Sequence, residues 1–255
     1  IMQVRTPSQR ILHFNQSDDR LAPCRQTCPA EIDIPKYIAQ IREGDYEGAV
    51  STIRDRNPLL LACGRVCPHP CEVNCRRAIE DEPVSINQLK RFAADYEMNS
   101  GQRLPVPIAP LTGKRVAVVG GGPAGLTCAF FLRRLGHEVT IFEAMPKLGG
   151  MLRYGIPEYR LPKQVLDWEI DGILALHVQS HCNQKLGQDF DVDSLKADGF
   201  DAIFMGIGAW QDSSLRVEGE QLKGCWTGIN FLSRRADGEQ IPTGRSAVII
   251  GGGNT

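Results

Sequence analysis

Six of the nine cysteines lie between residues 24 and 75, where their spacing suits metal chemistry. Cys24 and Cys28 are separated by three residues, and Cys28 precedes a proline. The other four follow the pattern Cys-x3-Cys-Pro-x2-Cys-x3-Cys. Thiolates hold iron–sulfur clusters, and a cysteine followed by proline recurs among cluster ligands. The sequence therefore predicts an iron–sulfur site, and its candidate ligands are Cys24, Cys28, Cys63, Cys67, Cys71 and Cys75.

Zinc and disulfides fit these thiols less well. Structural zinc sites favour cysteines two residues apart, whereas the close pairs here have three intervening residues. An odd total of nine cysteines, without a secretory signal at the start of the chain, fits a disulfide framework poorly. A [4Fe–4S] cluster takes four thiolates, so six cysteines favour one cluster and leave two possible. Pro68 and Pro70 exclude a regular helix through residues 67–71, so we expect a loop that wraps the cluster.

A glycine-rich turn at residues 120–125 has the form that binds the pyrophosphate of a dinucleotide. It follows an expected strand, Arg115–Val119, and opens an expected helix, Pro123–Leu135, whose N-terminus would face the phosphates. Glu143 ends the next expected strand, where its carboxylate would accept hydrogen bonds from a ribose. The candidate residues here are Gly120, Gly121, Gly122, Pro123, Ala124, Gly125, Glu143 and Ala144.

Two successive glycines shortly after Glu143 favour FAD over NAD, because they let the backbone approach an extended cofactor. The further candidate cofactor-binding residues are Leu148, Gly150, Met151, Leu152 and Gly208. A second glycine turn follows the apolar residues 246–250, which we expect to form a strand. Gly251 and Gly253 match the start of a second nucleotide-binding motif, so we expect the natural polypeptide to continue. The choice between NADH and NADPH stays open.

The surrounding elements follow from the pattern of apolar and capping residues. Asp33 is expected to cap a helix that Gly44 ends, and Asp45 a second helix that ends at Asn57-Pro58. A third helix is expected to begin after Ser85, and its inward residues would be Ile86, Leu89, Ala93 and Tyr96. Strands at 115–119, 138–142 and 202–205, with helices at 163–175 and 229–235, predict an α/β layered design.

We therefore predict an α/β protein of several parts. An N-terminal α-helical iron–sulfur domain precedes a Rossmann-like FAD-binding domain and the truncated start of a second, NAD(P)H-binding domain. The expected boundaries are an extended segment at 1–22, the helical [4Fe–4S] domain at 23–98, a proline-rich linker at 99–113, the first part of the FAD-binding domain at 114–210 and the incomplete NAD(P)H-binding domain at 211–255.

Three motifs resemble a known family. Cys-Gly-Arg-Val-Cys-Pro at 63–68, Gly-Gly-Gly-Pro-Ala-Gly at 120–125 and Gly-Ile-Pro-x-Tyr-Arg-Leu-Pro at 155–162 are similar to the small subunit of bacterial glutamate synthase. The N-terminal part of dihydropyrimidine dehydrogenase and the flavin subunits of electron-bifurcating transhydrogenases share them. The resemblance implies that the first glycine turn binds FAD, with Glu143 on its ribose and with Met151, Arg160 and the backbone near Leu186 in contact. The second turn would bind NADH or NADPH.

The resemblance also divides the cysteines between two clusters. One cluster would use Cys28, Cys67 and Cys71, and the other would use Cys24 and Cys75. The second cluster's remaining cysteine pair has no counterpart in residues 1–23. Relatives can use Gln or Glu as a ligand one turn into the next helix, where this chain has Lys90, a cation that cannot bind iron. We therefore expect one cluster, whose fourth ligand is Cys24, Cys75 or Cys63.

These features predict an electron-transfer oxidoreductase that passes electrons between NAD(P)H, FAD and a [4Fe–4S] cluster to a redox partner within a larger complex. No catalytic side chain is predicted, because the cofactors carry the reaction. The alternative is a non-catalytic docking subunit with decayed cofactor sites, and the retained glycines and Glu143 argue against it.

Charge and hydropathy argue against a nucleic-acid-binding protein and a membrane-spanning protein. The net charge is −1 with both signs interspersed, which leaves no basic footprint for nucleic acid. The sequence contains no run of 18 apolar residues, which is about the length needed to span a bilayer. We therefore expect a soluble, cytoplasmic protein. Cys128, Cys182 and Cys225 are isolated, which argues against a dithiol reductase.

Overall fold

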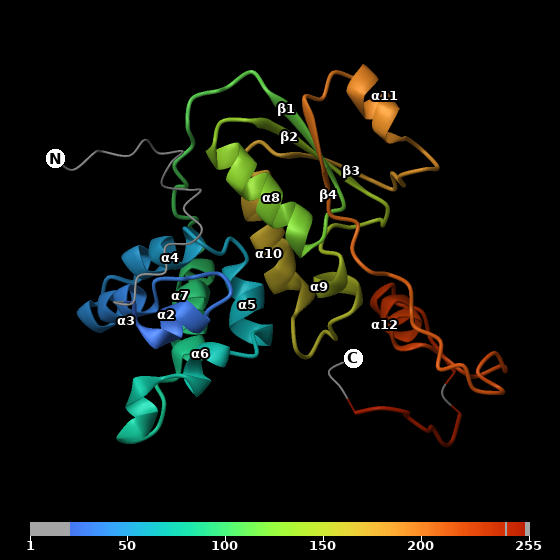
Figure 1. The fold of residues 1–255 in the computed structure, drawn as a ribbon, viewed down its shortest axis with the longest axis horizontal. Coiled ribbons are helices and arrows are strands. Elements are labelled where there is room, and N and C mark those ends of the chain that lie inside the picture. Colours follow the sequence, from blue (N-terminus) through green and yellow to red (C-terminus); the bar gives the residue numbers. More distant parts are fainter. Residues whose placement is uncertain (1–20, 243, 253–255) are drawn as a thin grey trace.

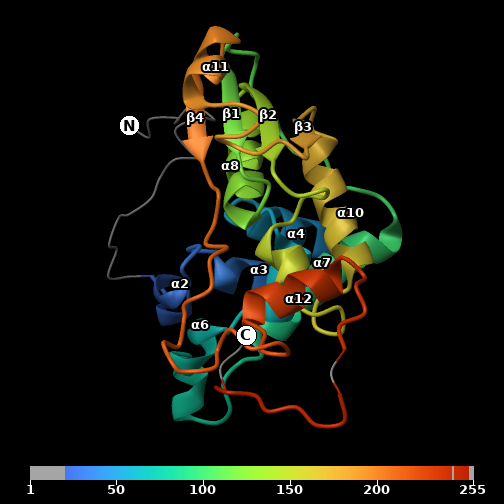
Figure 2. The same ribbon diagram turned by 90° about the vertical axis from the view of Figure 1, so that its right-hand side faces the viewer.

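A computed structural model describes residues 21–242 and 244–252, in which a bundle of helices precedes a parallel sheet covered by further helices (Figure 1, Figure 2). This arrangement confirms the predicted α/β class. The extended segment expected at 1–22 falls almost entirely outside the described residues, and so does Gly253.

The first part, here called the helical unit, consists of the helices α2 to α7. Their bounds are α2 (Pro23–Thr27), α3 (Ile34–Glu43), α4 (Tyr46–Arg54), α5 (Leu60–Val66), α6 (Pro70–Val73), the 3-10 turn η1 (Arg76–Ile79) and α7 (Ile86–Ser100). The predicted caps of α3 and α4 are confirmed. Asp33 accepts from the Lys36 N–H at 3.3 Å, and Asp45 accepts from the Gly48 N–H at 2.9 Å. Gly44 ends α3 with a φ of 79°, a left-handed conformation that suits glycine.

Two details of these helices differ from the prediction. The helix α4 ends at Arg54, before the expected stop at Asn57-Pro58. On α7, Ile86 and Ala93 are buried as predicted, but Tyr96 is 39 % exposed and packs on Tyr46. The buried face of α7 carries Lys90 and Glu97 instead. Both side chains find charged or polar partners inside, which a pattern of apolar residues does not reveal.

The second part, here called the sheet unit, contains four parallel strands in the order β3-β2-β1-β4. Its elements are β1 (Arg115–Val119), α8 (Pro123–Arg134), β2 (Glu138–Glu143), α9 (Met151–Tyr154), α10 (Lys163–Leu174), β3 (Gln179–Cys182), α11 (Val192–Ala197) and β4 (Ala202–Met205). Chain order reverses on either side of β1, which is the position where doubly wound sheets bind nucleotides. The sequence did not predict β3, whose residues are polar, or the short helix α11.

The chain beyond the sheet unit includes one helix, α12 (Gly228–Ala236). The strand expected at 246–250 is wrong, because no strand forms there among the described residues. Val248 is 90 % exposed and Ile249 is 87 % exposed. An apolar run becomes a strand only where a neighbouring strand accepts its hydrogen bonds, and this segment has none among the described residues.

The two units share their hydrophobic cores. Leu59 and Ala62 of the helical unit lie in the same buried cluster as Val118 and Ile141 of the sheet, and Val165 of α10 lies in the core of the helical unit. The connector after Gly101 is fixed in place, since the Ala109 N–H donates to the Arg134 carbonyl at 2.9 Å. No helix in the described part of the chain has the length and apolar character needed to cross a membrane.

Candidate functional site

The first glycine turn has the geometry of a dinucleotide-binding loop. Gly120 leaves β1 with a φ of 106°, and its N–H donates to the Phe142 carbonyl at 2.8 Å. A Cβ on Gly125 would collide with the Gly120 carbonyl oxygen and lie 3.1 Å from Val118 Cγ1. The first turn of α8 therefore packs directly on the loop, and this close approach requires a glycine at position 125.

The second glycine pair stacks against the first turn. The Gly149 N–H donates to the Gly121 carbonyl at 2.8 Å. Gly150 has a φ of 49°, and a Cβ on it would lie 2.7 Å from Gly122 Cα. Residues 120–122 and 148–150 thus form one backbone surface that side chains would obstruct.

This surface fits a pyrophosphate. A Cβ on Gly122 would have one neighbour within 4 Å, Gly150 Cα at 3.6 Å, so the turn is open at this point. No side chain caps the N-terminus of α8, and Pro123 occupies its first turn. Free N–H groups and the helix dipole there favour an anion. The glycine surface and the uncapped helix therefore fit the phosphates of FAD.

Glu143 lies at the end of β2, directly beside the glycine turn. It is buried, and it accepts from the Gly121 N–H at 2.6 Å and from the Met145 N–H at 2.8 Å. The carboxylate therefore holds the glycine turn against the end of β2. The sequence predicted a ribose-binding role for Glu143 and missed this role in shaping the turn.

The other predicted nucleotide-site residues occupy varied positions. Leu148 is buried against Gly121, while Ala144 is exposed beside Glu143. Met151 and Leu152 are half-buried in α9. Four other predicted residues have no described contact with the glycine turns: Arg160, Leu186, Gly208 and Gly251.

Two residues near the turn had no signal in the sequence. Gly206 follows β4, and its carbonyl oxygen blocks the place where a Cβ on Gly120 would lie. Arg153 is buried and donates from Nε to the Leu148 carbonyl at 2.5 Å, while its guanidinium pairs with Asp167. Arg153 therefore fixes the second glycine segment to α10. Only the fold brings these groups together.

The cysteines lie on helices and helix ends, so the predicted single loop through 67–71 is wrong in part. Cys63 lies within α5, and Cys67 is its C-cap; Cys71 lies within the short helix α6. Pro68 does stop α5, but Pro70 then occupies the first turn of α6, where a proline is tolerated. The same arrangement occurs at α2, which contains Cys24 and has Cys28 as its C-cap. A spacing of three intervening residues is one helical turn, so it places both thiols of a pair on one side of a helix.

All nine cysteines are free thiols, and the six candidate ligands fall into two neighbourhoods. Burial and the nearby Cys28 and Cys67 raise the pKa of Cys71 to about 11. A hydrogen bond from Cys63 lowers the pKa of Cys67 to about 5, with help from Lys90. Burial raises the pKa of Cys24, and the nearby Cys75 and Cys28 act in the same direction. The first neighbourhood contains Cys28, Cys63, Cys67 and Cys71. The second contains Cys24 and Cys75, and Cys24 also lies beside Cys28 of the first.

Lys90 lies inside the first neighbourhood. It is 6 % exposed, and its Nζ donates to Cys63 Sγ at 3.0 Å. Burial acts to lower the pKa of Lys90, but the adjacent Cys63 and Cys67 raise it by more than burial lowers it. The net shift is upward, so the ammonium form is favoured. The His69 N–H donates to Cys67 Sγ at 3.3 Å. The sequence identified Lys90 only as a non-ligand and missed its contact with the thiols.

The sulfur donors are of the kind that holds an iron–sulfur cluster. In the part of the chain that the structure describes, no three Cys, His, Asp or Glu side chains are arranged to hold one metal ion. A single zinc ion needs its thiolates within about 2.3 Å of one point, whereas a [4Fe–4S] cluster takes four thiolates on four irons. The Nδ1 atom of the His69 ring pairs with Glu72 Oε2 at 3.2 Å. Four thiols in one neighbourhood fit a [4Fe–4S] cluster.

Two family models match this chain. "Dihydroprymidine dehydrogenase domain II, 4Fe-4S cluster" matches residues 16–102. "Pyridine nucleotide-disulphide oxidoreductase" matches residues 77–161 and 114–255. The first match covers the helical unit, and the second covers the sheet unit and the chain beyond it.

Curated relatives carry the same combination. The chain is 44 % identical over 246 residues to the NADPH-Fe(3+) oxidoreductase subunit beta of Geobacter sulfurreducens, covering 93 % of this chain and 36 % of that one. It is 41 % identical to the NAD-dependent dihydropyrimidine dehydrogenase subunit PreT of Salmonella typhimurium, covering 91 % of this chain and 56 % of that one. It is 36 % identical to the glutamate synthase [NADPH] small chain of Mycobacterium tuberculosis, covering 91 % of this chain and 50 % of that one. The chain thus spans about a third to just over half of these relatives, and the resemblance drawn from its motifs is confirmed.

Proposed function

This chain belongs to the pyridine nucleotide-disulphide oxidoreductase family, and on that premise we propose that it is an electron-transfer module of a redox complex. Its cofactors are a [4Fe–4S] cluster, FAD and NAD(P)H, as predicted. When bound, these groups would take a hydride, that is two electrons and a proton, from NAD(P)H and release the electrons one at a time to a partner, or run in reverse.

The observation that carries the proposal is that two different cofactor neighbourhoods share one folded core. In one, the glycine turns and Glu143 form a surface for a dinucleotide. In the other, Lys90 donates to Cys63 and lies near the remaining three thiols. Leu59 and Ala62 join the helix that carries Cys63 to the core of the sheet unit. A docking subunit with decayed sites would not need to retain either neighbourhood.

We assign the cluster to Cys28, Cys63, Cys67 and Cys71. Cys63 is the fourth ligand in this proposal because it hydrogen-bonds Cys67 and Lys90 in the same neighbourhood. Cys24 and Cys75 belong to a second neighbourhood that supplies two thiols, half of what a further cluster would need. In this proposal the residues 23–98 form the cluster domain and 114–210 the first part of the flavin domain.

The chain's own residues orient and tune these groups. Glu143 fixes the glycine turn and would accept the ribose hydroxyls of FAD. The uncapped N-terminus of α8 would face the pyrophosphate. The Lys90 ammonium places positive charge beside the thiols, and the backbone N–H of His69 donates a hydrogen bond to Cys67. Hydrogen bonds to the sulfurs tune a cluster's potential.

Relatives are named as subunits, of an Fe(3+) oxidoreductase and of a dihydropyrimidine dehydrogenase, and we propose that this chain likewise serves a separate redox subunit. We propose the cytoplasm as its location, because a reducing compartment preserves free thiols.

Absorption spectroscopy with an iron and sulfide assay tests the proposal. We expect the anaerobically purified protein to show flavin bands, a broad absorbance that dithionite bleaches, and about four irons per chain. Cys67→Ser should lose most of the iron and keep the flavin, whereas the exposed Cys225→Ser should keep both. A colourless protein, or one with a single zinc ion on these cysteines, would contradict the proposal.

A further inference from the structure

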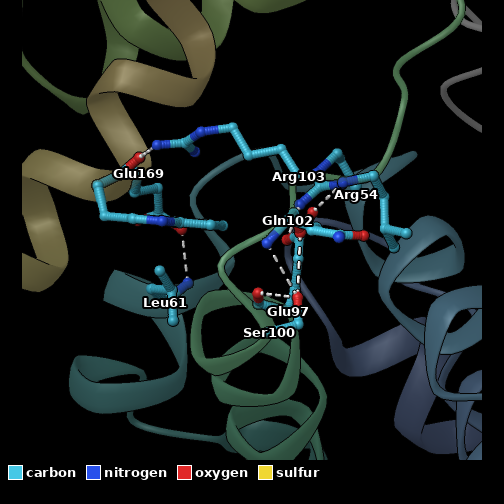
Figure 3. Close-up of polar contacts among 9 residues, drawn as sticks. Arg54, Leu61, Glu97, Ser100, Gln102, Arg103 and Glu169 are labelled. Carbon is cyan, nitrogen blue, oxygen red and sulfur yellow. Dashed lines mark hydrogen bonds and ion pairs between the residues drawn. The ribbon is translucent and has the colours of Figure 1, made fainter.

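The helix that carries Cys63 lacks a cap of its own. The N-cap position of α5 is Leu59, which provides no side-chain hydrogen bond. Instead, Glu169 of α10 accepts from the Leu61 N–H at 2.5 Å and from the Ala62 N–H at 3.1 Å. A dashed line joins Leu61 to Glu169 in Figure 3. The sheet unit thus supplies the cap for a helix of the helical unit.

Glu169 differs from the other acids of its helix. Asp171 is exposed and Asp167 is half-buried, whereas Glu169 is 5 % exposed. Burying a carboxylate is costly unless hydrogen bonds and opposite charges compensate. Two backbone N–H donors meet Glu169, and Arg54 and Arg65 lie near enough to favour its charge. Such a buried group is tied to one position.

The helix α10 is firmly part of the sheet unit and reaches the second glycine segment. Its Leu166, Ile170 and Ile173 lie in the core of the sheet unit. A Cβ on Gly149 would lie 3.2 Å from Leu166 Cδ2, so α10 packs directly on the segment that stacks against the glycine turn. Any shift of this segment would reach α10.

On its other side α5 is held by α7. The Asn87 amide donates to the Gly64 carbonyl at 3.1 Å, and a Cβ on Gly64 would lie 3.0 Å from Arg91 Cα. Lys90 donates to Cys63 itself. The short helix α5 is therefore held between α7 of its own unit and Glu169 of the other, with Cys63 one residue beyond the capped Ala62.

We propose that Glu169 is a positioning residue that fixes the cluster-bearing helix α5 relative to the flavin-binding glycine segment. The inference rests on the proposed function and names the link between its two sites. Removing the carboxylate leaves the Leu61 and Ala62 N–H groups buried without an acceptor, so the first turn of α5 has to move and Cys63 with it.

The test uses the full-length protein carrying its cofactors, with Glu169→Ala, Glu169→Gln and the exposed Asp171→Asn as a matched control from the same helix. Stopped-flow mixing with NAD(P)H would record flavin reduction and then the reduction of the cluster. The EPR spectrum of the reduced cluster would report its surroundings, and flavin and iron assays would report occupancy.

We expect Glu169→Ala to retain flavin and an unchanged rate of flavin reduction, with electron transfer to the cluster about tenfold slower, the size of effect seen when groups that orient metal ligands are removed. Its EPR spectrum should shift. Glu169→Gln keeps one acceptor oxygen, so its rate of electron transfer to the cluster should lie between those of the wild type and Glu169→Ala. Asp171→Asn should match the wild type.

If Glu169→Ala does not fold, Glu169→Gln decides the question, because a wild-type rate and spectrum in that variant would overturn the inference. Equal rates and spectra in wild type and both Glu169 variants would overturn it too, while leaving the proposed function intact. A wild-type protein without iron or flavin would overturn the proposed function and this inference together.

Discussion

Lys90 is the residue whose position most constrains the chemistry of the thiols. A buried ammonium is unfavourable unless opposite charge compensates for the lost water. Here the Cys63 sulfur accepts a hydrogen bond from the ammonium at 3.0 Å, and Cys67, whose pKa is lowered, supplies the opposite charge. Because a lysine has no lone pair to offer iron while it is charged, it acts on a cluster as a fixed positive charge. Such a charge favours the reduced, more negative form of the cluster.

Replacing Lys90 with methionine should therefore lower the reduction potential of the cluster. Two unit charges about 4 Å apart interact by about 4 kcal/mol at an effective dielectric constant of 20, and part of this is screened. We expect a fall on the order of 50–100 mV, where 59 mV is a tenfold change for a one-electron couple. A potentiometric titration followed by EPR would measure it.

The neighbouring Arg91 provides the control, because its side chain is exposed and pairs with Asp95. Arg91→Gln should leave the potential nearly unchanged. Equal shifts in the two variants would show that Lys90 acts only through the overall charge of the helix.

At the scale of elements, the glycines of the first turn are required for two different reasons, close packing of the backbone and access for the ligand. Gly125 is required by packing, because its Cβ would meet the Gly120 carbonyl oxygen. Gly122 has a φ of −78°, which any residue adopts, and its Cβ would meet little protein. Its glycine is therefore explained by the ligand alone.

Gly122→Ala and Gly125→Ala should differ accordingly. We expect Gly122→Ala to keep the thermal stability of the flavin-free protein but to lose at least tenfold in flavin affinity, because the methyl group occupies the side open to the pyrophosphate. Gly125→Ala should lose both, since the backbone of α8 or of the turn has to move. Flavin titration and thermal unfolding of the flavin-free proteins would check this. Wild-type flavin affinity in Gly122→Ala would place the pyrophosphate elsewhere.

Sequence predicted those elements whose signals are local. The caps Asp33 and Asp45 and the strand, turn and helix around Gly120 each depend on residues a few positions apart. The helix α5 was missed, because its cap Glu169 is 108 residues away from Leu61. A loop was predicted at 67–71 from Pro68 and Pro70, although Pro70 is tolerated in the first turn of the helix α6. The polar strand β3 depends on pairing with β2 and not on its own residues.

At the scale of the whole molecule, the helical and sheet units are joined by buried contacts and not only by the connector. Leu59 and Ala62 enter the core of the sheet unit, and Val165 enters that of the helical unit. Glu169 lies at this junction, beside a cavity of about 220 Å³ that Arg54, Glu97 and Arg103 help to line. In Figure 3 these side chains converge between α10 and the helices of the helical unit. Charge at the junction should therefore affect the stability of both units at once.

The stability of the protein should depend on pH through Glu169. Burial raises the pKa of this carboxyl to about 8, from 4.5 for a free side chain, against the opposing effect of its N–H donors and of Arg54 and Arg65. Between these two values the folded protein holds a proton that the unfolded chain has released. The free energy of unfolding therefore falls as the pH rises, by up to about 1.4 kcal/mol per pH unit. The contribution is complete below pH 4.5 and lost above about pH 8.

Glu169→Gln has no proton to exchange and should lack this slope. We expect the thermal midpoint of the wild type, measured relative to that of Glu169→Gln, to fall steadily between about pH 5 and pH 8, by roughly 2–4 °C for each kcal/mol in a domain of this size. Asp171→Asn, which removes an exposed carboxylate from the same helix, should follow the wild type. Parallel curves for the wild type and Glu169→Gln would mean that Glu169 is ionised throughout this range, and that its two N–H donors and the arginines outweigh its burial.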